Sequence, residues 1–273
     1  MNMEKKVIGM MHPGKMGSAI GADLLAQGHH VLWSSAGRSE ATGRRARVAG
    51  LEEAAGIAEL TRRCEVIISV CPPHAALDVA SQIKEFSGIF VEANAVSPAT
   101  VNEIANIMRP TGAAVVDGGI MGPPPGAPEE ISRYRVFLSG DEACTIAPLF
   151  SGGEIRASVI DGPVGAASAL KMAWAAWMKG SSALLLTIRA FARAYHIEDA
   201  ILAEWVRGIP GLAERSDEAA RLLAEKGWRW PGEMEEIAVT ARAAGVNEAM
   251  FLGAADVFRQ AAQAVEPPSR TRS

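Results

Sequence analysis

VIGMMHPGKMG, residues 7–17, is the stretch that decides the fold. It opens with an apolar run, Val7–Met11, of the length expected for a buried β-strand, and the following His12-Pro13-Gly14 favours a turn. An Ala- and Leu-rich pattern from about Met16 to Gln27 predicts a helix, and Gly28 suits its C-terminal stop. The chain is therefore expected to begin with a strand–turn–helix unit.

Further strand and helix patterns alternate along the first half of the chain. Short apolar runs predict strands at His30–Trp33, Val66–Val70, Ile89–Glu92 and Ala114–Asp117. Between the last two, Ala99–Met108 predicts a helix, with Ser97 as its N-cap and Pro98 in its first turn. Strands that alternate with such helices indicate right-handed βαβ units and a parallel sheet covered on both faces.

The pattern changes after about Asp161. From Gly162 to Val265 only long Ala-rich helical periodicities occur, interrupted at Gly208–Gly211 and at Trp230–Gly232. We therefore predict an α/β domain over residues 1–160 and an all-helical domain over residues 161–265. The last residues, 266–273, are polar and partly proline-rich, and we expect them to be disordered.

Composition narrows the classes of protein to which this chain can belong. Of its 273 residues 49% are hydrophobic and 5% aromatic, and the net charge is −4. Because nucleic-acid binders usually carry a basic excess, we expect no nucleic-acid partner. The N-terminal apolar run is too short for a signal peptide, and we expect no membrane partner and a cytoplasmic location.

Neither a disulfide framework nor a metal site is expected. The three cysteines, Cys64, Cys71 and Cys144, form no CxxC pair and fit a reducing compartment. The five histidines show no metal-ligand spacing, and no HExxH motif occurs. We expect Cys71 to be a small buried residue rather than a nucleophile.

The turn after the first strand carries part of a dinucleotide-binding fingerprint. Gly14 and Gly17 occupy the second and third glycine positions of G-x-G-x-x-G, where they would let the backbone approach a pyrophosphate and let the helix pack closely on the strand. His12 stands at the first position, with Pro13 after it. The pyrophosphate would still meet the N-terminal end of the helix. The alternative is that both glycines serve packing alone.

The end of the second strand bears on the choice of cofactor. An NAD enzyme usually has an Asp or Glu there, which holds the ribose 2′-hydroxyl. This chain has Ser34, Ser35 and Arg38 instead, with no acidic residue before Glu40. Hydroxyls and a guanidinium suit a 2′-phosphate, which predicts NADP(H) as the cofactor. Alternatively, Arg38 is one of several solvated arginines near the next helix.

Several motifs together resemble a known family. The segments GKMG, VCPP, EANAVSPAT, DGGIMGPPP and GPVGAASALK are similar to the NADP-binding domain of β-hydroxyacid dehydrogenases and 6-phosphogluconate dehydrogenase. In the helical half, MKGSSALL and WRWPGEMEEIA resemble an uncharacterised C-terminal domain attached to some of these proteins, and imine reductases are a neighbouring branch. The resemblance implies a Rossmann-type, doubly wound parallel sheet followed by an all-helical domain, and an NADP(H)-dependent oxidoreductase.

The resemblance also implies roles for residues at matching positions. The cofactor would be held by His12, Pro13, Gly14, Lys15, Met16, Ser34, Ser35, Arg38, Cys71, Pro72, Pro73 and Asn94. The catalytic lysine of the family falls on Lys171, which would act as general acid or base. The substrate would lie near Gly119, Met121, Gly122, Trp174, Trp230 and Glu233.

Two positions depart from the family's pattern. Where the family carries D-x-x-x-S-G-G, this chain reads DGGIMGP from Asp117, so that Met121 replaces a serine that would help to hold a carboxylate. One turn after the lysine, Ala175 replaces an asparagine. Both changes remove polar contacts to a substrate, which puts a simple 3-hydroxy acid in doubt and allows a bulkier or less polar molecule.

The segment Trp228–Glu236 has two interpretations. As the wall of a substrate pocket, Arg229 would pair with an anionic group and Glu233 would orient a hydroxyl or an amine. As structure, the tryptophans would belong to the core, and the acidic residues would favour the start of a helix just after Pro231.

Lys171 is the only ionisable residue within Val164–Met178, and its neighbours are Ala, Leu, Met and Trp. Because a buried ammonium without partners is costly, its side chain is expected to be paired, to face a polar cavity or to reach water along apolar neighbours. The leading hypothesis is hydride transfer between nicotinamide and a hydroxyl or carbonyl carbon of a small-molecule substrate, with Lys171 handling the proton. The alternatives are an imine reductase, with a C=N acceptor, and a non-catalytic NADP-binding protein.

The run Val164–Ile188 is apolar nearly all round, apart from Lys171 and Lys179. Such a helix must be buried on several sides. We therefore expect a homodimer in which these helices pack across a two-fold axis, as they do in the enzymes that the chain resembles.

Overall fold

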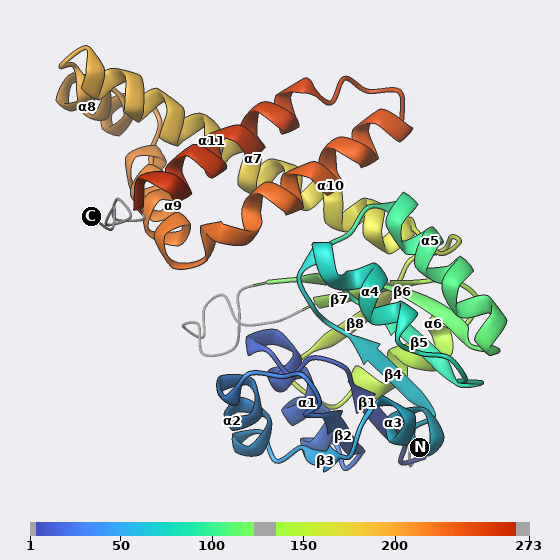
Figure 1. Cartoon of the computed structure of the whole chain (residues 1–273). Coiled ribbons are helices and arrows are strands. Elements are labelled where there is room, and N and C mark those ends of the chain that lie inside the picture. The colour runs from blue at the N-terminus through green and yellow to red at the C-terminus, as the bar shows by residue number, and fades with distance from the viewer. Residues whose placement is uncertain (1–3, 123–134, 266–273) are drawn as a thin grey trace, which may run out of the picture. The chain divides into compact units, whose positions relative to one another are not determined.

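The computed structural model describes residues 4–122 and 135–265. Its contacts divide the chain into two compact units, Met1–Lys171 and Met172–Ser273. The division falls after Lys171, whereas the expected domain boundary lies between residues 160 and 161. The tail that we expect to be disordered, residues 266–273, lies outside the described residues. Helices and strands are labelled in Figure 1.

The first unit is built on an eight-stranded sheet in the order β3-β2-β1-β4-β5-β6-β7-β8. Its strands are β1 (Val7–Met10), β2 (His30–Ser34), β3 (Glu52–Ala54), β4 (Val66–Ser69), β5 (Ile89–Glu92), β6 (Ala114–Met121), β7 (Arg135–Ser139) and β8 (Arg156–Val159). Neighbouring strands are parallel except for β6 and β7, which are antiparallel. The predicted doubly wound α/β fold is confirmed, while the expectation of a wholly parallel sheet is wrong for that one pair.

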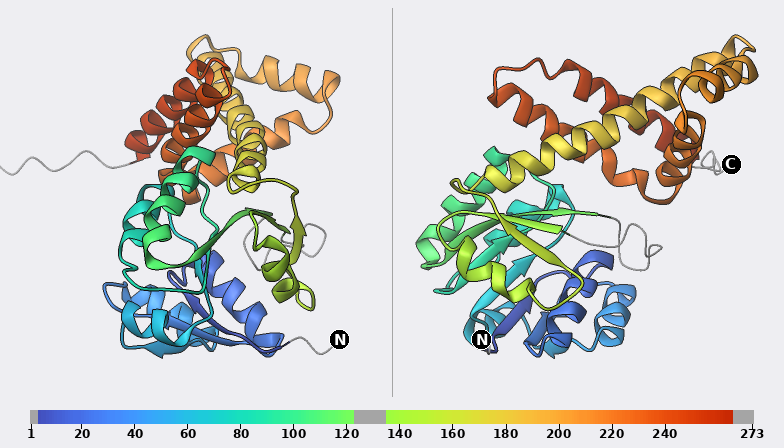
Figure 2. Two further views of the ribbon diagram at one scale, coloured as in Figure 1. Left: turned by 90° about the vertical axis from the view of Figure 1, so that its right-hand side faces the viewer. Right: turned by 180° about the vertical axis from the view of Figure 1, so that it is seen from behind.

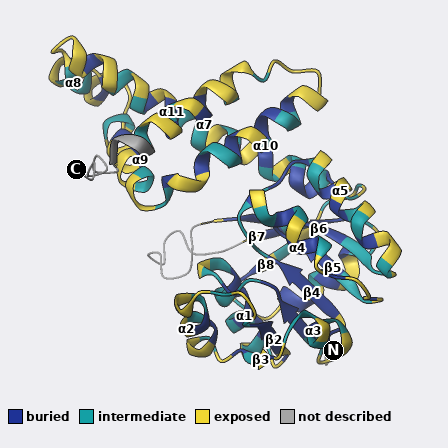
Figure 3. Ribbon diagram, in the orientation of Figure 1, coloured by how far each residue is buried: buried dark blue, intermediate teal, exposed yellow. Residues whose placement is uncertain are grey.

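Helices cover both faces of this sheet. They are α1 (Lys15–Ala26), α2 (Glu40–Val48), α3 (Ile57–Arg63), α4 (Ala76–Ser81), α5 (Pro98–Met108) and α6 (Ala143–Ile146). One apolar core joins strand residues to α1, α2 and α6, and a second joins the opposite face to α3, α4 and α5. Buried residues accordingly gather on the strands in Figure 3. Because both faces are covered, the ends of the strands are where this sheet can offer polar groups to a ligand.

Local signals in the sequence set the ends of several helices. The side chain of Ser97 caps α5, since its Oγ accepts a hydrogen bond from the Thr100 amide at 3.1 Å. Gly28 follows α1 with a φ of 85°, a left-handed conformation that glycine adopts without strain. Both predicted helix ends are thus confirmed.

The chain after β8 is helical throughout the described residues, as predicted. The helices are α7 (Ala166–Ala194), α8 (Glu198–Gly208), α9 (Leu212–Lys226), α10 (Trp230–Ala243) and α11 (Ala249–Val265). The longest of these is α7, with 29 residues, and the right-hand view of Figure 2 shows it as one uninterrupted helix. None of the helices in the described part of the chain is long and apolar enough to cross a membrane.

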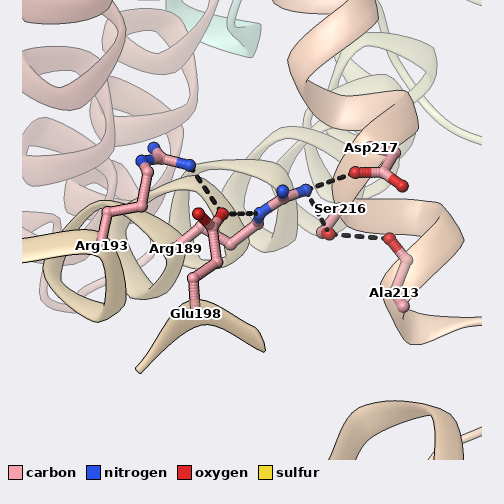
Figure 4. A network of polar contacts seen from close by, with 6 residues as sticks. All are labelled: Arg189, Arg193, Glu198, Ala213, Ser216 and Asp217. Carbon is pink, nitrogen blue, oxygen red and sulfur yellow. Dashed lines mark hydrogen bonds and ion pairs between the residues drawn. The ribbon is translucent and has the colours of Figure 1, made fainter. Parts of the chain in front are cut away.

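A network of charged side chains joins three helices of the second unit (Figure 4). From α7, Arg189 donates to Glu198 of α8 at 2.8 Å, to the Ser216 hydroxyl of α9 at 3.1 Å, and to Asp217. The same Glu198 accepts from Arg193 at 2.8 Å. Because one guanidinium serves partners on two other helices, Arg189 fixes how α8 and α9 pack on α7.

Candidate cofactor and active site

The turn between β1 and α1 leaves room for a ligand on one side and excludes side chains on the other. A Cβ on Gly14, the N-cap of α1, would meet no atom within 4 Å. A Cβ on Gly17 would lie 2.2 Å from the carbonyl oxygen of His12, so only glycine fits there. These are the two roles that the fingerprint assigns to its second and third glycines.

Seven buried side-chain nitrogen or oxygen atoms have no hydrogen-bond partner among the described residues, and three of them belong to this turn, to the end of β2 and to the loop after it. These three are His12 Nδ1, Ser34 Oγ and Arg38 Nε, located after β1 and at or after the end of β2. Because β1 and β2 are parallel neighbours, their carboxyl ends meet at one edge of the sheet. Buried polar atoms without partners are costly, and a set of them at one edge indicates a site that a polar ligand completes.

The charges at this edge favour an anion. Burial, followed by the nearby Arg38, lowers the pKa of His12 to about 4, so the imidazole is neutral near pH 7. Burial also lowers the pKa of Arg38, whose guanidinium nevertheless stays charged. Among the described residues, no carboxylate forms an ion pair with Arg38, so a half-buried positive charge is left for a ligand.

The ends of β4 and β5 supply the next part of the edge. Asn94 accepts a hydrogen bond from the Cys71 amide through Oδ1 and donates through Nδ2 to Ser69 Oγ at 3.1 Å. Burial, followed by the nearby Glu92, raises the pKa of the Cys71 thiol to about 12. A thiol that stays protonated is a poor nucleophile, and Cys71 is partly rather than fully buried. Pro72 and Pro73 follow, and Pro73 is buried.

A row of four polar side chains crosses the sheet at the level where β4, β5 and β7 end, in the middle of β6. Ser69, Glu92, Asp117 and Ser139 are direct neighbours in register on β4, β5, β6 and β7, and all four are buried. Burial raises the pKa of the Glu92 carboxyl to about 8, and the neighbouring Asp117 adds to the effect. One oxygen of Glu92 accepts from the Asn94 amide at 3.1 Å, while the other has no partner among the described residues.

Asp117 connects this row to the helix that carries Lys171. Its carboxylate accepts hydrogen bonds from the Gly165 amide at 2.9 Å and from the Ser168 amide at 2.8 Å. The hydroxyls of Ser168 and Ser139 also donate to it, at 2.6 Å and 3.1 Å. The carboxylate therefore caps the N-terminal end of α7.

Lys171 lies against the same strand. Its ammonium donates a hydrogen bond to the carbonyl oxygen of Ile120 at 2.6 Å, and the side chain is half-buried. A Cβ on Gly119 would come within 2.8 Å of the Ala167 carbonyl oxygen and 3.3 Å of Lys171 Cβ. Met121 ends β6 and is buried, and Gly122 follows with a φ of 124°. Gly119 and Lys171 are thus brought together.

The other residues expected to contact substrate belong to the second unit. Trp230 is buried and packs edge-on against Phe258, with ring centroids 4.9 Å apart. Glu233 is buried and pairs with Lys179 at 2.6 Å and with Arg229 at 3.0 Å. Trp174 is exposed. These contacts give Trp230 a place in the core and give Glu233 ion pairs within the unit. The roles of Trp174, Trp230 and Glu233 in substrate binding stay predictions.

Sequence reasoning missed several members of the site. The sequence motifs assign no role to Glu92, Ser139 or Ser168, and they include Asp117 only as the first residue of DGGIMGP. The one local signal was Ser168, which stands three residues before Lys171 and therefore on the same face of a helix. Within the described residues, no group of three or more His, Cys, Asp or Glu side chains could hold a metal ion.

Comparison with protein families gives two matches along the chain. The model of the NAD binding domain of 6-phosphogluconate dehydrogenase matches residues 7–144. A domain of unknown function, DUF1932, matches residues 192–261. The first match covers half of the chain and includes the turn after β1 and the ends of β2, β4 and β5.

One curated relative is similar over part of the chain. An uncharacterised 28.5 kDa protein from Methanothermus fervidus, named for the 5′ region of 7S RNA, is 31% identical over 168 residues, which are 61% of this chain and 63% of that protein. That alignment spans less than two thirds of the relative's length.

Two solved structures share the fold over almost the whole chain. A 3-hydroxyisobutyrate dehydrogenase from Salmonella typhimurium has a TM-score of 0.72 at 16% identity and covers 96% of this chain and 95% of its own. A reductive aminase from Aspergillus terreus, in complex with NADPH and ethyl levulinate, has a TM-score of 0.60 at 18% identity, with the same coverage. At these identities the two structures share the fold alone. The chain therefore belongs to the family defined by the NAD binding domain of 6-phosphogluconate dehydrogenase, and its fold is the NAD(P)-binding fold of hydroxyacid dehydrogenases.

Proposed function

We propose that this protein is an NADP(H)-dependent oxidoreductase that transfers a hydride between nicotinamide and a hydroxyl or carbonyl carbon of a small molecule. The observation that carries the proposal is the set of unpartnered buried atoms of His12, Ser34 and Arg38, at the sheet edge where this family binds a dinucleotide. The chain's residues fit such a ligand, since the edge offers a guanidinium, a hydroxyl and an open helix N-terminus.

Each part of the edge would hold one part of the cofactor. The turn His12–Met16 and the first amides of α1 would hold the pyrophosphate. Ser34, Ser35 and Arg38 would hold a 2′-phosphate, because hydroxyls and a guanidinium can donate hydrogen bonds to it. Cys71–Pro73 would line the adenosine, and Asn94 would lie near the nicotinamide ribose. When bound, the cofactor would supply or accept the hydride.

Lys171 would move the proton that accompanies the hydride. In the reduction, its ammonium would protonate the oxygen that gains charge; in the oxidation, its amine would take that proton back. The Ile120 carbonyl that accepts its hydrogen bond holds no transferable proton. A substrate oxygen that takes the place of that carbonyl would accept the hydrogen bond from the ammonium and would then receive its proton.

Replacing Arg38 tests the choice of cofactor. We expect Arg38→Ala to narrow the difference in binding free energy between NADPH and NADH by about 1.5–3 kcal/mol, the scale of hydrogen bonds to a charged group. Fluorescence titration with each cofactor measures this difference. Arg44→Ala, an exposed arginine of the adjoining helix α2, is the matched control and should leave it unchanged. Equal affinity of the unaltered protein for NADPH and NADH would contradict the assignment.

A second candidate reaction is the reduction of a C=N bond. The likeness to a reductive aminase, together with the loss of two polar substrate contacts at Met121 and Ala175, favours this alternative. NADPH oxidation across a panel of carbonyl compounds and imines separates the two reactions. A protein that binds NADPH and oxidises it with no member of the panel would instead be a cofactor-binding protein without catalysis.

We also propose that the protein is a homodimer built on α7. Four apolar side chains spaced seven residues apart are exposed along this helix, namely Leu170 (37%), Trp177 (61%), Leu184 (61%) and Phe191 (49%). A spacing of seven keeps them on one face, whereas Leu185 and Ala192 on a neighbouring face are buried. A second copy of α7 is the occupant that a two-fold axis would place on this face.

Light scattering at micromolar concentration tests the dimer. We expect the unaltered protein to have twice the mass of the chain and Leu184→Glu to shift it towards the monomer, because a charge would be buried in the interface. Val48→Glu, at an exposed position of α2, should leave the mass unchanged. A monomeric unaltered protein is the result that would rule out this assembly.

A further inference from the structure

We propose that strand β6 positions Lys171, with Asp117 and Gly119 as the positioning residues. The inference rests on the proposed function, in which Lys171 is the acid or base, and extends it to the strand residues that contact the helix carrying this lysine. Three points of β6 contact the first turns of α7, and each fixes a different feature of the helix.

Asp117 fixes the N-terminal end of α7. The first amides of a helix have no partners within the helix, and here two strand side chains supply them. The Gly165 and Ser168 amides donate to Asp117, and the Ala167 amide donates to Ser139 Oγ at 3.0 Å. The Ser139 hydroxyl donates in turn to Asp117, so β6 and β7 hold the helix end together.

Gly119 sets how closely α7 approaches the sheet. It lies two residues after Asp117, on the same face of β6. A Cβ at this position would stand 2.8 Å from the Ala167 carbonyl oxygen, closer than real Cβ atoms come. Since that oxygen belongs to helix backbone, an alanine could be accommodated only if α7 or β6 moved.

Ile120 fixes the end of the lysine side chain. Its carbonyl oxygen accepts from Lys171 Nζ, while Lys171 Cβ lies opposite Gly119. Strand β6 therefore contacts both the backbone of α7 and the tip of the lysine side chain. A long side chain held at both ends has lost most of its rotamer freedom before a substrate arrives.

Chemical labelling of Lys171 tests this positioning without a substrate. The rate at which an amine-reactive reagent modifies Lys171 is followed by peptide mass spectrometry at several alkaline pH values, with exposed Lys84 as the internal reference. We expect Gly119→Ala to speed labelling of Lys171 about ten-fold or more, the factor that corresponds to losing a hydrogen bond to a charged group. Gly253→Ala, in α11, places its methyl group in open space and is the matched control.

Turnover provides the second measurement. With a substrate found in the NADPH oxidation panel, we expect Gly119→Ala and Ser168→Ala to lower kcat about ten-fold or more while the dissociation constant of NADPH stays unchanged. Ser168→Thr keeps the hydroxyl that donates to Asp117 and should restore most of the rate. A folded Asp117→Asn variant should show the same loss of kcat as Ser168→Ala. If Asp117→Asn does not fold, Gly119→Ala and Ser168→Ala test the positioning role without it.

The two proposals fail in different ways. Unchanged labelling and unchanged kcat in folded Gly119→Ala and Ser168→Ala would overturn the positioning role and leave the proposed reaction intact. Faster labelling together with a Lys171→Met variant that keeps its turnover would mean that β6 does hold Lys171, but that the lysine is not the acid or base.

Discussion

Lys171→Met is expected to lower turnover by about 10²–10⁴-fold, the usual loss when general acid–base help is removed. Methionine keeps most of the volume of the lysine stem, so the contacts of Lys171 Cβ beside Gly119 are retained and the fold is expected to persist. The substitution removes the ammonium and its hydrogen bond to the Ile120 carbonyl. The measurement is kcat with a substrate found in the NADPH oxidation panel.

NADPH titration and a matched variant complete this experiment. The affinity of Lys171→Met for NADPH should equal that of the unaltered protein, because the residues proposed to hold the phosphates are untouched. Lys84→Met replaces an exposed lysine of the same unit and should keep full turnover. If Lys171→Met retains turnover close to that of the unaltered protein, the lysine is structural and the mechanism is wrong.

Glu92→Gln is expected to change how the free energy of unfolding depends on pH. The pKa of Glu92 is raised from its ordinary value of 4.5 to about 8, so the folded protein keeps a proton that the unfolded chain releases. This stability is fully present below the ordinary pKa and is lost as pH rises towards 8. Glutamine mimics the protonated carboxyl at every pH, and its carbonyl can still accept from the Asn94 amide.

Urea unfolding at a series of pH values measures this effect. Relative to Glu92→Gln, the unaltered protein should lose several kcal/mol between about pH 4.5 and pH 8, since each pKa unit corresponds to about 1.4 kcal/mol. Taking the difference between the two proteins removes the contributions of all other titrating groups. Parallel pH curves for the two proteins would show that Glu92 is ionised in the folded state.

The strands at the centre of the sheet could be predicted from the sequence, whereas those near its edges could not. The runs at β1, β4 and β5 are apolar because both of their faces are covered, and their predicted ranges agree with the structure within a residue. By contrast, β3 reads Glu-Glu-Ala and β8 begins with Arg156. An edge strand needs no apolar run, because its backbone groups pair with one neighbouring strand on one side and with water on the other.

Some residues of the candidate site belong to one short motif in the sequence, whereas others are far apart in the sequence and meet only in the fold. The turn after β1 is a contiguous motif, so the positions of Gly14 and Gly17 could be predicted from their spacing. The row of Ser69, Glu92, Asp117 and Ser139 could not, because more than 20 residues separate each member from the next. Only the register of the strands brings them together, and a single sequence does not reveal register over such separations.

The cap on α7 has a consequence for the order in which the chain is made. Because a chain folds from its N-terminal end as it is synthesised, β6 and β7 are available before residues 165–168 have left the ribosome. Until then the Asp117 carboxylate has the Ser139 hydroxyl but lacks the two amides and the hydroxyl that α7 contributes. Burying a carboxylate with so few donors is unfavourable. We therefore expect the region of the sheet around Asp117 to pack fully only when the helical turn that carries Lys171 has emerged. The first unit and its lysine would then reach their folded positions together.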